Sequence, residues 1–171
     1  MKTGQNFGIL YCLLVICQVL LCNYFQFTPY ITLTILPAMI LCIPLTISTI
    51  GCLIITFVTA LATDWLAEGI IGLNAVALLP VAILRKPVIG LFIGEDLITR
   101  QDSFSFRKNG AAKVNAAILT SLTLFMILYI IFDGAGTRPF WFNLARGAAS
   151  LACSWIMSII TVNTLTPDDR K

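Results

Sequence analysis

The sequence contains no histidine, and only 11% of its 171 residues carry a charged side chain. Histidine is the commonest general base and the commonest metal ligand in proteins, so its absence disfavours acid–base and metal-dependent catalysis. A soluble domain has about 25% charged residues. This chain is 58% hydrophobic and has too few charges to keep a globule hydrated. The two deficits point to a membrane protein without a catalytic domain.

Motifs that carry catalysis or cofactor binding are also missing. The chain has no Walker A sequence, no H-E-x-x-H, and no G-x-S-x-G with a histidine to serve it. The cysteines form no C-x-x-C pair and lie in or beside apolar runs, where cysteine behaves as a small hydrophobe. They are Cys12, Cys17, Cys22, Cys42, Cys52 and Cys153. We therefore expect a protein that is not an enzyme, with no cofactor, no metal and no nucleic-acid partner.

Long apolar runs are what the sequence has in abundance. Leu10–Leu21, Ile50–Leu61 and Ile118–Ile131 are apolar all round, which predicts membrane helices rather than the alternating strands of a barrel. The predicted fold class is an all-α polytopic membrane protein with about six transmembrane helices, in a single integral membrane domain over residues 1–171. The expected spans are about 7–27, 29–45, 48–64, 69–84, 111–132 and 140–162.

The second and third expected spans share an uncharged stretch, Tyr30–Thr63. This stretch is too long for one span of about 20 residues and short for two. Pro37 and Pro44 interrupt it, which favours two short helices joined by a tight turn. The alternative is a single tilted span with a re-entrant piece.

The basic residues predict how the chain is oriented. With six spans, the N-terminus, the loop 85–113 and the C-terminal tail share one side, and five spans would move only the N-terminus. That side holds nine of the eleven Lys and Arg residues, namely Lys2, Arg85, Lys86, Arg100, Arg107, Lys108, Lys113, Arg170 and Lys171. By the positive-inside rule, loop 85–113 and the C-terminus are cytoplasmic. Apolar residues from Val88 to Ile98 recur at near-helical spacing, which predicts an interfacial amphipathic helix in this loop.

A few polar residues lie at the ends of the spans on the other side. Asp64 and Glu68 are four residues apart. Paired carboxylates can carry protons, but a helix end that faces water is the favoured interpretation. Asn74 is expected to hydrogen-bond to a neighbouring helix. Arg146 either snorkels to the surface or pairs with Asp64, Glu68 or Asp133, and we take Asp64 as the partner to test.

The segment between these carboxylates and the basic loop resembles a known family. Asp64 is followed by Gly69-Ile70-Ile71-Gly72-Leu73-Asn74-Ala75, then by Arg85-Lys86-Pro87 and Leu91-Phe92. This pattern is similar to that of the rod shape-determining protein MreD family, in its Bacteroidetes-type form. The resemblance is specific over about residues 60–96, and Glu68 in the turn departs from the usual pattern. The residues that carry this resemblance are taken as structural, namely Asp64, Gly69, Gly72, Asn74 and Arg85. The two glycines lie at the start of the fourth span, where they are expected to let a neighbouring helix approach closely.

The resemblance implies a non-catalytic protein of the bacterial inner membrane. Members of the family work with MreC in the elongation complex that directs side-wall peptidoglycan synthesis and maintains cell shape. The wider partners implied are a glycosyltransferase–transpeptidase pair, the MreB filament, acting indirectly, and membrane lipids.

The family fold is similar to that of the substrate-binding subunits of energy-coupling-factor vitamin transporters, which supplies the alternative function. Those subunits show an A-x-x-x-A motif on their first helix, whereas the first apolar run here has no alanine. They also gather polar and aromatic residues around an outward pocket. Trp65, Asn74, Trp141 and Arg146 are the residues that could form such a pocket here.

Overall fold

The computed structural model describes residues 3–24, 31–100, 104, 106–134 and 139–166, and this part of the chain is helical apart from its connections. The elements are α1 (Thr3–Tyr24), α2 (Leu36–Cys42), α3 (Thr49–Thr63), the π-helix η1 (Asp64–Glu68), α4 (Leu73–Phe92), α5 (Glu95–Arg100), α6 (Phe106–Asn109), α7 (Ala111–Gly134) and α8 (Phe140–Leu165). Five helices in the described residues are long and apolar enough to cross a membrane: α1, α3 with η1, α4, α7 and α8. The chain is therefore a polytopic α-helical membrane protein.

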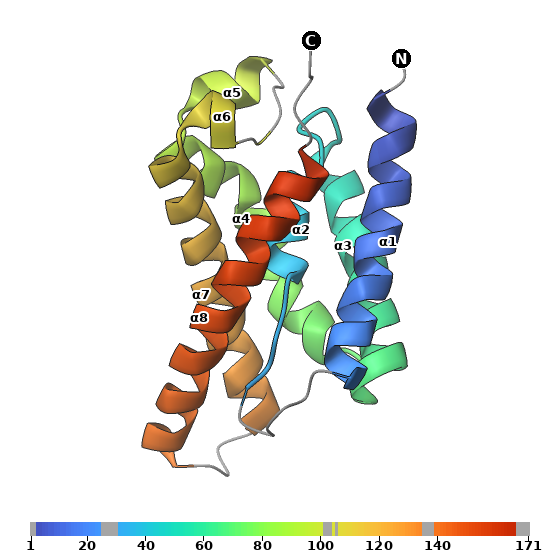
Figure 1. Cartoon of the computed structure of the whole chain (residues 1–171), viewed down its shortest axis with the longest axis vertical. Coiled ribbons are helices and arrows are strands. Elements are labelled where there is room, and N and C mark those ends of the chain that lie inside the picture. Colours follow the sequence, from blue (N-terminus) through green and yellow to red (C-terminus); the bar gives the residue numbers. More distant parts are fainter. Residues whose placement is uncertain (1–2, 25–30, 101–103, 105, 135–138, 167–171) are drawn as a thin grey trace.

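The long helices run side by side along the long axis of the molecule (Figure 1). The start of α1, the short helices α5 and α6, and the end of α8 lie at one end, which we call the loop end. The opposite end holds η1, the end of α7 and the start of α8, and we call it the turn end. The first and last helices thus meet the loop 85–113 at one end of the bundle, as the six-span prediction requires.

The second expected span, 29–45, is not a transmembrane helix. Residues 31–35 form no helix, Ile35 being the N-cap of α2, and α2 has only seven residues, all of them buried. Pro37 lies in the first turn of α2, and Pro44 follows directly after its C-cap Ile43. The residue before a proline is disfavoured in the helical region, so the helix ends there. The non-helical segment and the short helix together run from the turn end towards the loop end, where α3 begins (Figure 1). The chain therefore crosses the bundle here without a full-length helix, and it does not return to the same end as the re-entrant alternative requires.

Side chains of α1 and α8 hydrogen-bond the backbone of this non-helical segment. Thr32 N and Thr34 N donate to the hydroxyls of Ser150 and Ser154, each at 3.0 Å. On the other side, Gln18 accepts from Ile35 N at 2.9 Å and donates to Leu33 O at 3.1 Å. Gln18, Ser150 and Ser154 are all buried. An irregular backbone inside an apolar bundle is tolerated only where such partners exist.

The fourth span is longer than the sequence predicted. The expected end was residue 84, before Arg85, but α4 continues through Arg85 and Pro87 to Phe92. Proline is tolerated within membrane helices because neighbouring groups satisfy the freed carbonyls. The first part of the expected loop 85–113 is therefore helix. The apolar residues from Val88 to Ile98 also do not form one helix, as the predicted interfacial helix required, because Gly94 (φ 123°) separates the end of α4 from α5.

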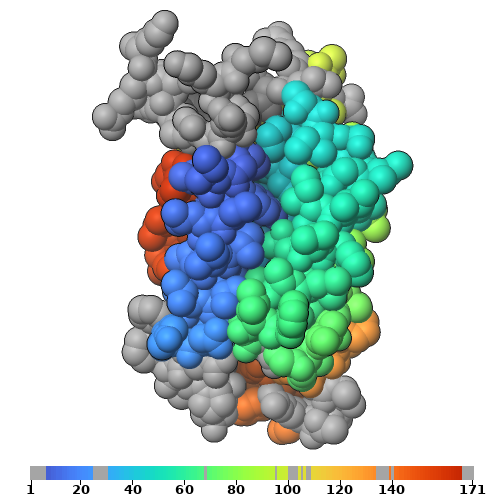
Figure 2. All heavy atoms as spheres, turned by 90° about the vertical axis from the view of Figure 1, so that its right-hand side faces the viewer, coloured from blue at the N-terminus to red at the C-terminus, as the bar shows by residue number. Residues whose placement is uncertain are grey.

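The remaining spans agree with the sequence, although α1 begins four residues before the expected 7–27 and residues 25–27 of that span lie outside the described residues. Helices α7 and α8 cover the expected 111–132 and 140–162 and extend slightly beyond them, and α3 matches 48–64 to within a residue at each end. Figure 2 shows α1 and α3 side by side on one face of the molecule. The outward residues of that face are large and apolar, which is typical of a surface in contact with lipid. They include Ile9, Leu13, Ile16 and Leu20 on α1 and Ile50, Ile54, Phe57 and Val58 on α3.

We expect the Ser154→Ala substitution to destabilise the protein by about 1–3 kcal/mol, because Thr34 N would lose its acceptor in the interior. The matched control is Ser158→Ala, one turn further along α8. Ser158 is equally buried, but its hydroxyl has no hydrogen-bond partner. Its replacement should be neutral or slightly stabilising. Reversible unfolding in mixed detergent micelles measures both, and equal losses would contradict this role of Ser154.

Candidate functional site

The carboxylate of Asp64 organises the turn that leads into α4. Asp64 is fully buried at the start of η1. Its Oδ2 accepts a hydrogen bond from Gly72 N at 2.8 Å, and its Oδ1 accepts one from Asn74 N at 3.0 Å. Gly72 is the N-cap residue of α4, and it has no side chain that could accept a hydrogen bond from the first turn of the helix. Asp64 thus satisfies N–H groups at this helix start from eight to ten residues earlier in the chain. The expectation that Asp64 faces water is wrong.

The two glycines of the turn are needed for their backbone conformation. Gly69 has φ 72° and Gly72 has φ 101°, both in the left-handed region that residues with a Cβ rarely adopt. A Cβ on either glycine would meet no atom within 4 Å. Close approach of a neighbouring helix, the reason expected from the sequence, is therefore not why glycine occurs here. Glycine lets the chain leave η1 and reverse into α4 within a few residues.

Asn74 is buried one residue into α4, and its backbone amide is the group that donates to Asp64. This bond joins the main chain of Asn74 to the end of α3, and the expected bond from its side chain to a neighbouring helix stays a prediction. Asn23, close to the end of α1, donates from its side chain to Leu66 O at 3.1 Å. The turn from Asp64 to Asn74, which we call the aspartate turn, is therefore held from both α1 and α4. The side chain of Glu68 lies outside the described residues.

Arg146 pairs with Asp133 and not with Asp64. Arg146 Nη1 donates to Asp133 Oδ2 at 2.5 Å, which joins α8 to α7 at the turn end. The side chain of Arg146 is only 7% exposed, so it does not snorkel to the surface. The hypothesis of an Asp64–Arg146 pair is wrong, because Arg146 is paired with Asp133, whereas both carboxylate oxygens of Asp64 accept hydrogen bonds from the backbone of its own turn.

Arg85 lies apart from the other predicted residues. It is twelve residues beyond Leu73 along α4, or about 18 Å at 1.5 Å per residue. Its side chain is 2% exposed, and Nη1 contacts Cys52 Sγ on α3 at 3.6 Å. Its Nε and Nη2 atoms are buried and have no hydrogen-bond partner. Sequence reasoning placed Arg85 at a helix end, but the structure places it inside the bundle.

The structure therefore brings together only part of the predicted set. Asp64, Gly69, Gly72 and Asn74 form the aspartate turn, whereas Arg146 and Arg85 belong to other places. Sequence analysis missed Gln18, Ser150 and Ser154. A signal was present, because Gln18 is the one amide inside the first apolar run, and serines recur at every fourth residue of α8 from 150 to 158. Such spacing places them on one face of a helix.

Comparison of the chain with models of known protein families, with curated proteins and with solved structures finds no match. The chemistry available at the aspartate turn is hydrogen bonding and charge placement. In the described part of the chain, no three Cys, Asp or Glu side chains are close enough to hold a metal ion. The turn fixes the geometry of one end of the bundle.

A double-mutant cycle distinguishes the two possible partners of Arg146. We expect Asp133→Ala and Arg146→Ala to be coupled by about 1 kcal/mol or more, because each removes the same contact. The control cycle combines Arg146→Ala with Asp64→Ala. It should be additive to within about 0.5 kcal/mol, because the two sites share no partner. Unfolding in mixed micelles gives the four stabilities of each cycle. Stronger coupling of Arg146 to Asp64 than to Asp133 would contradict the observed pairing.

Proposed function

We propose that this protein is a non-enzymatic scaffold of the bacterial inner membrane, of the MreD type, which works with MreC in the cell-elongation complex. The observation that carries the proposal is that Asp64, Gly69, Gly72 and Asn74, which bear the resemblance to that family, form one hydrogen-bonded unit. These residues are separated by up to ten positions in the sequence. Because they assemble into a single turn, the structure offers a physical reason why these residue types occur together at this spacing.

The aspartate turn also presents a surface suited to a partner protein. Trp65 and Leu66 precede Gly69, Ile70 and Ile71 lie between Gly69 and Gly72, and all four side chains are 58% to 77% exposed. Their backbone is held by Asp64 and by the bond from Asn23 to Leu66. Large side chains on a rigid backbone lose little entropy on binding, and tryptophan is enriched among residues that dominate interface energies. We assign this surface, the turn surface, to the contact with MreC.

The opposite end of the bundle suits the cytoplasmic partners. The loop end carries Lys113 at the start of α7 and the basic positions of α5 and α6. Basic residues concentrate on the cytoplasmic side of membrane proteins and attract anionic lipid. In this orientation the turn surface faces the periplasm. The synthase pair and the MreB filament would then be linked to this protein by other members of the elongation complex.

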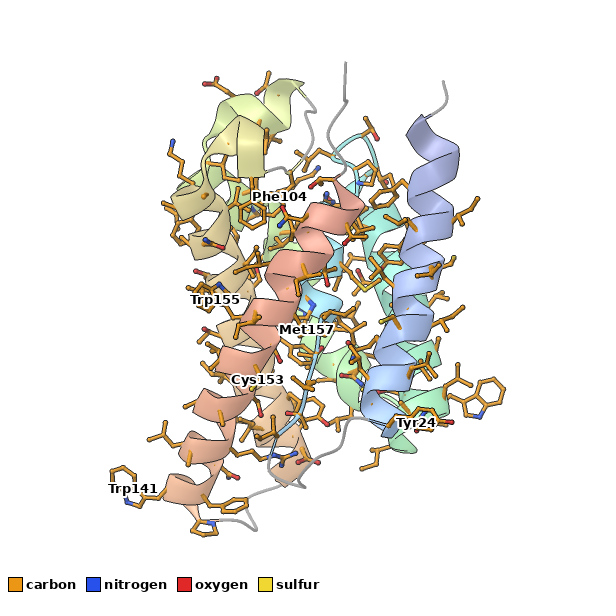
Figure 3. All side chains as sticks on the ribbon, in the orientation of Figure 1. Tyr24, Phe104, Trp141, Cys153, Trp155 and Met157 are labelled. Carbon is orange, nitrogen blue, oxygen red and sulfur yellow. The ribbon has the colours of Figure 1, made fainter. Side chains whose placement is uncertain are left out.

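The alternative, a vitamin-binding subunit of an energy-coupling-factor transporter, has less support from the geometry. It requires Trp65, Asn74, Trp141 and Arg146 to converge on an outward pocket. Trp65 and Trp141 are 77% and 78% exposed, whereas Asn74 and Arg146 are buried. Figure 3 shows Trp141 directed away from the bundle. The four side chains therefore do not line a common pocket.

The test is affinity purification of the tagged full-length protein from its own membranes in mild detergent, with the co-purifying proteins identified by mass spectrometry. We expect MreC and the cell-wall synthases in the wild-type sample. Trp65→Ala should lower MreC recovery by about tenfold, the change for a loss of about 1.4 kcal/mol. Asp64→Ala should lower it as well, because the turn loses the acceptor for two N–H groups.

The matched control is Trp141→Ala, which removes an equally exposed tryptophan at the same end of the bundle. It should leave MreC recovery unchanged. Recovery of an ATPase pair with its transmembrane coupling protein would instead support vitamin transport. Equal effects of Trp65→Ala and Trp141→Ala would exclude the turn surface as the contact, even if MreC is recovered with the wild type.

A further inference from the structure

Arg85 is a buried cation whose hydrogen-bonding capacity is largely unused. A guanidinium carries five N–H donors in a rigid planar fork. The thiol of Cys52, at 3.6 Å from Nη1, is a weak acceptor. The donors on Nε and Nη2 have no partner at all in the structure. A buried charge is tolerated where it is both paired and hydrogen-bonded, so these donors require an acceptor.

The residues around Arg85 do not supply a counter-charge. The ionisable side chains that bear on its charge are Cys52 on α3, Cys42 at the end of α2 and Tyr11 on α1. Tyr11 is already hydrogen-bonded to Thr59 at 3.1 Å. No carboxylate of the described residues contacts the guanidinium, in contrast to Arg146 with its Asp133. The acceptor must therefore come from another molecule or from outside the described residues.

We propose that Arg85 binds the phosphate group of an anionic membrane lipid. The guanidinium fork matches two oxygens of a phosphate in a bidentate arrangement. Arg85 lies seven residues before the end of α4, about 10 Å from the loop end along the helix. Lys86 follows directly and is half-buried, and Lys113 is exposed at the start of α7.

The position of Arg85 argues against a partner helix as the source of the anion. Its side chain is on the inner face of α4, against α3, and is 2% exposed. The outer face of α4 consists of apolar residues such as Ile83 and Leu91. A helix docked on that outer face would not reach the guanidinium. A headgroup is small and sits on a flexible chain, so it can reach between helix ends, and free phosphate shares the same chemistry.

The test is native mass spectrometry of the full-length protein released from detergent after exchange into defined lipid. The probes are phosphatidylglycerol, which is anionic, and phosphatidylethanolamine, which is zwitterionic. We expect wild-type protein to retain phosphatidylglycerol in preference, by about tenfold in apparent affinity. Arg85→Gln should abolish that preference. Arg85→Lys keeps the charge but not the fork, and should retain an intermediate preference.

Lys113→Gln is the matched control, because it removes one exposed cation from the same end of the bundle. It should keep the wild-type preference. The proposal would be overturned if Arg85→Gln preferred phosphatidylglycerol as strongly as the wild type, or if the wild type showed no preference. The wild-type measurement remains a test even if Arg85→Gln fails to fold. A thermal-shift titration with inorganic phosphate separates the two sources. Stabilisation of delipidated wild-type protein by phosphate, without any lipid preference, would overturn the lipid assignment in favour of free phosphate.

Discussion

The need to hydrogen-bond a non-helical backbone inside an apolar bundle determines how this molecule is assembled. Residues 31–35 cannot use water there, and a non-helical segment has no internal partners as a helix has. Gln18 satisfies one edge of the segment from α1, and Ser150 and Ser154 satisfy the other from α8. The first and last long helices are thereby bonded to the same non-helical segment. These polar contacts add to the apolar packing in fixing their relative position.

The aspartate turn solves the same problem at the end of the bundle. The helix is interrupted between η1 and α4, and the left-handed glycines leave N–H groups at the start of α4 without helical partners. The buried carboxylate of Asp64 accepts two of them. An anion beside a helix N-terminus is also favoured by the helix dipole. The exposed residues before and between the glycines are consequently held in one arrangement, which is what the proposed contact with a partner protein requires.

Sequence patterns predicted the parts of the fold that hydropathy alone decides. Uniformly apolar runs correctly predicted α1, α3 and α7, because lipid selects for apolar residues on every exposed face. Hydropathy wrongly predicted a transmembrane helix over residues 29–45, because a buried non-helical segment is as apolar as a helix that faces lipid. The glycines and Asp64 were recognised as important. Their geometry was not, because a carboxylate that caps a helix ten residues away depends on tertiary structure.

The end of the fourth span was predicted wrongly at Arg85, because a charged residue is costly within the membrane. A charged residue within an apolar run usually ends the span, because an isolated charge is expensive in lipid. Here α4 continues past Arg85, and the guanidinium turns inward, where Nη1 contacts the thiol of Cys52 and no described carboxylate is in contact. Arg146 is placed at a comparable depth from the other end and is neutralised by Asp133. The difference between the two arginines is therefore one of pairing, and an anion from outside the described chain makes them equivalent.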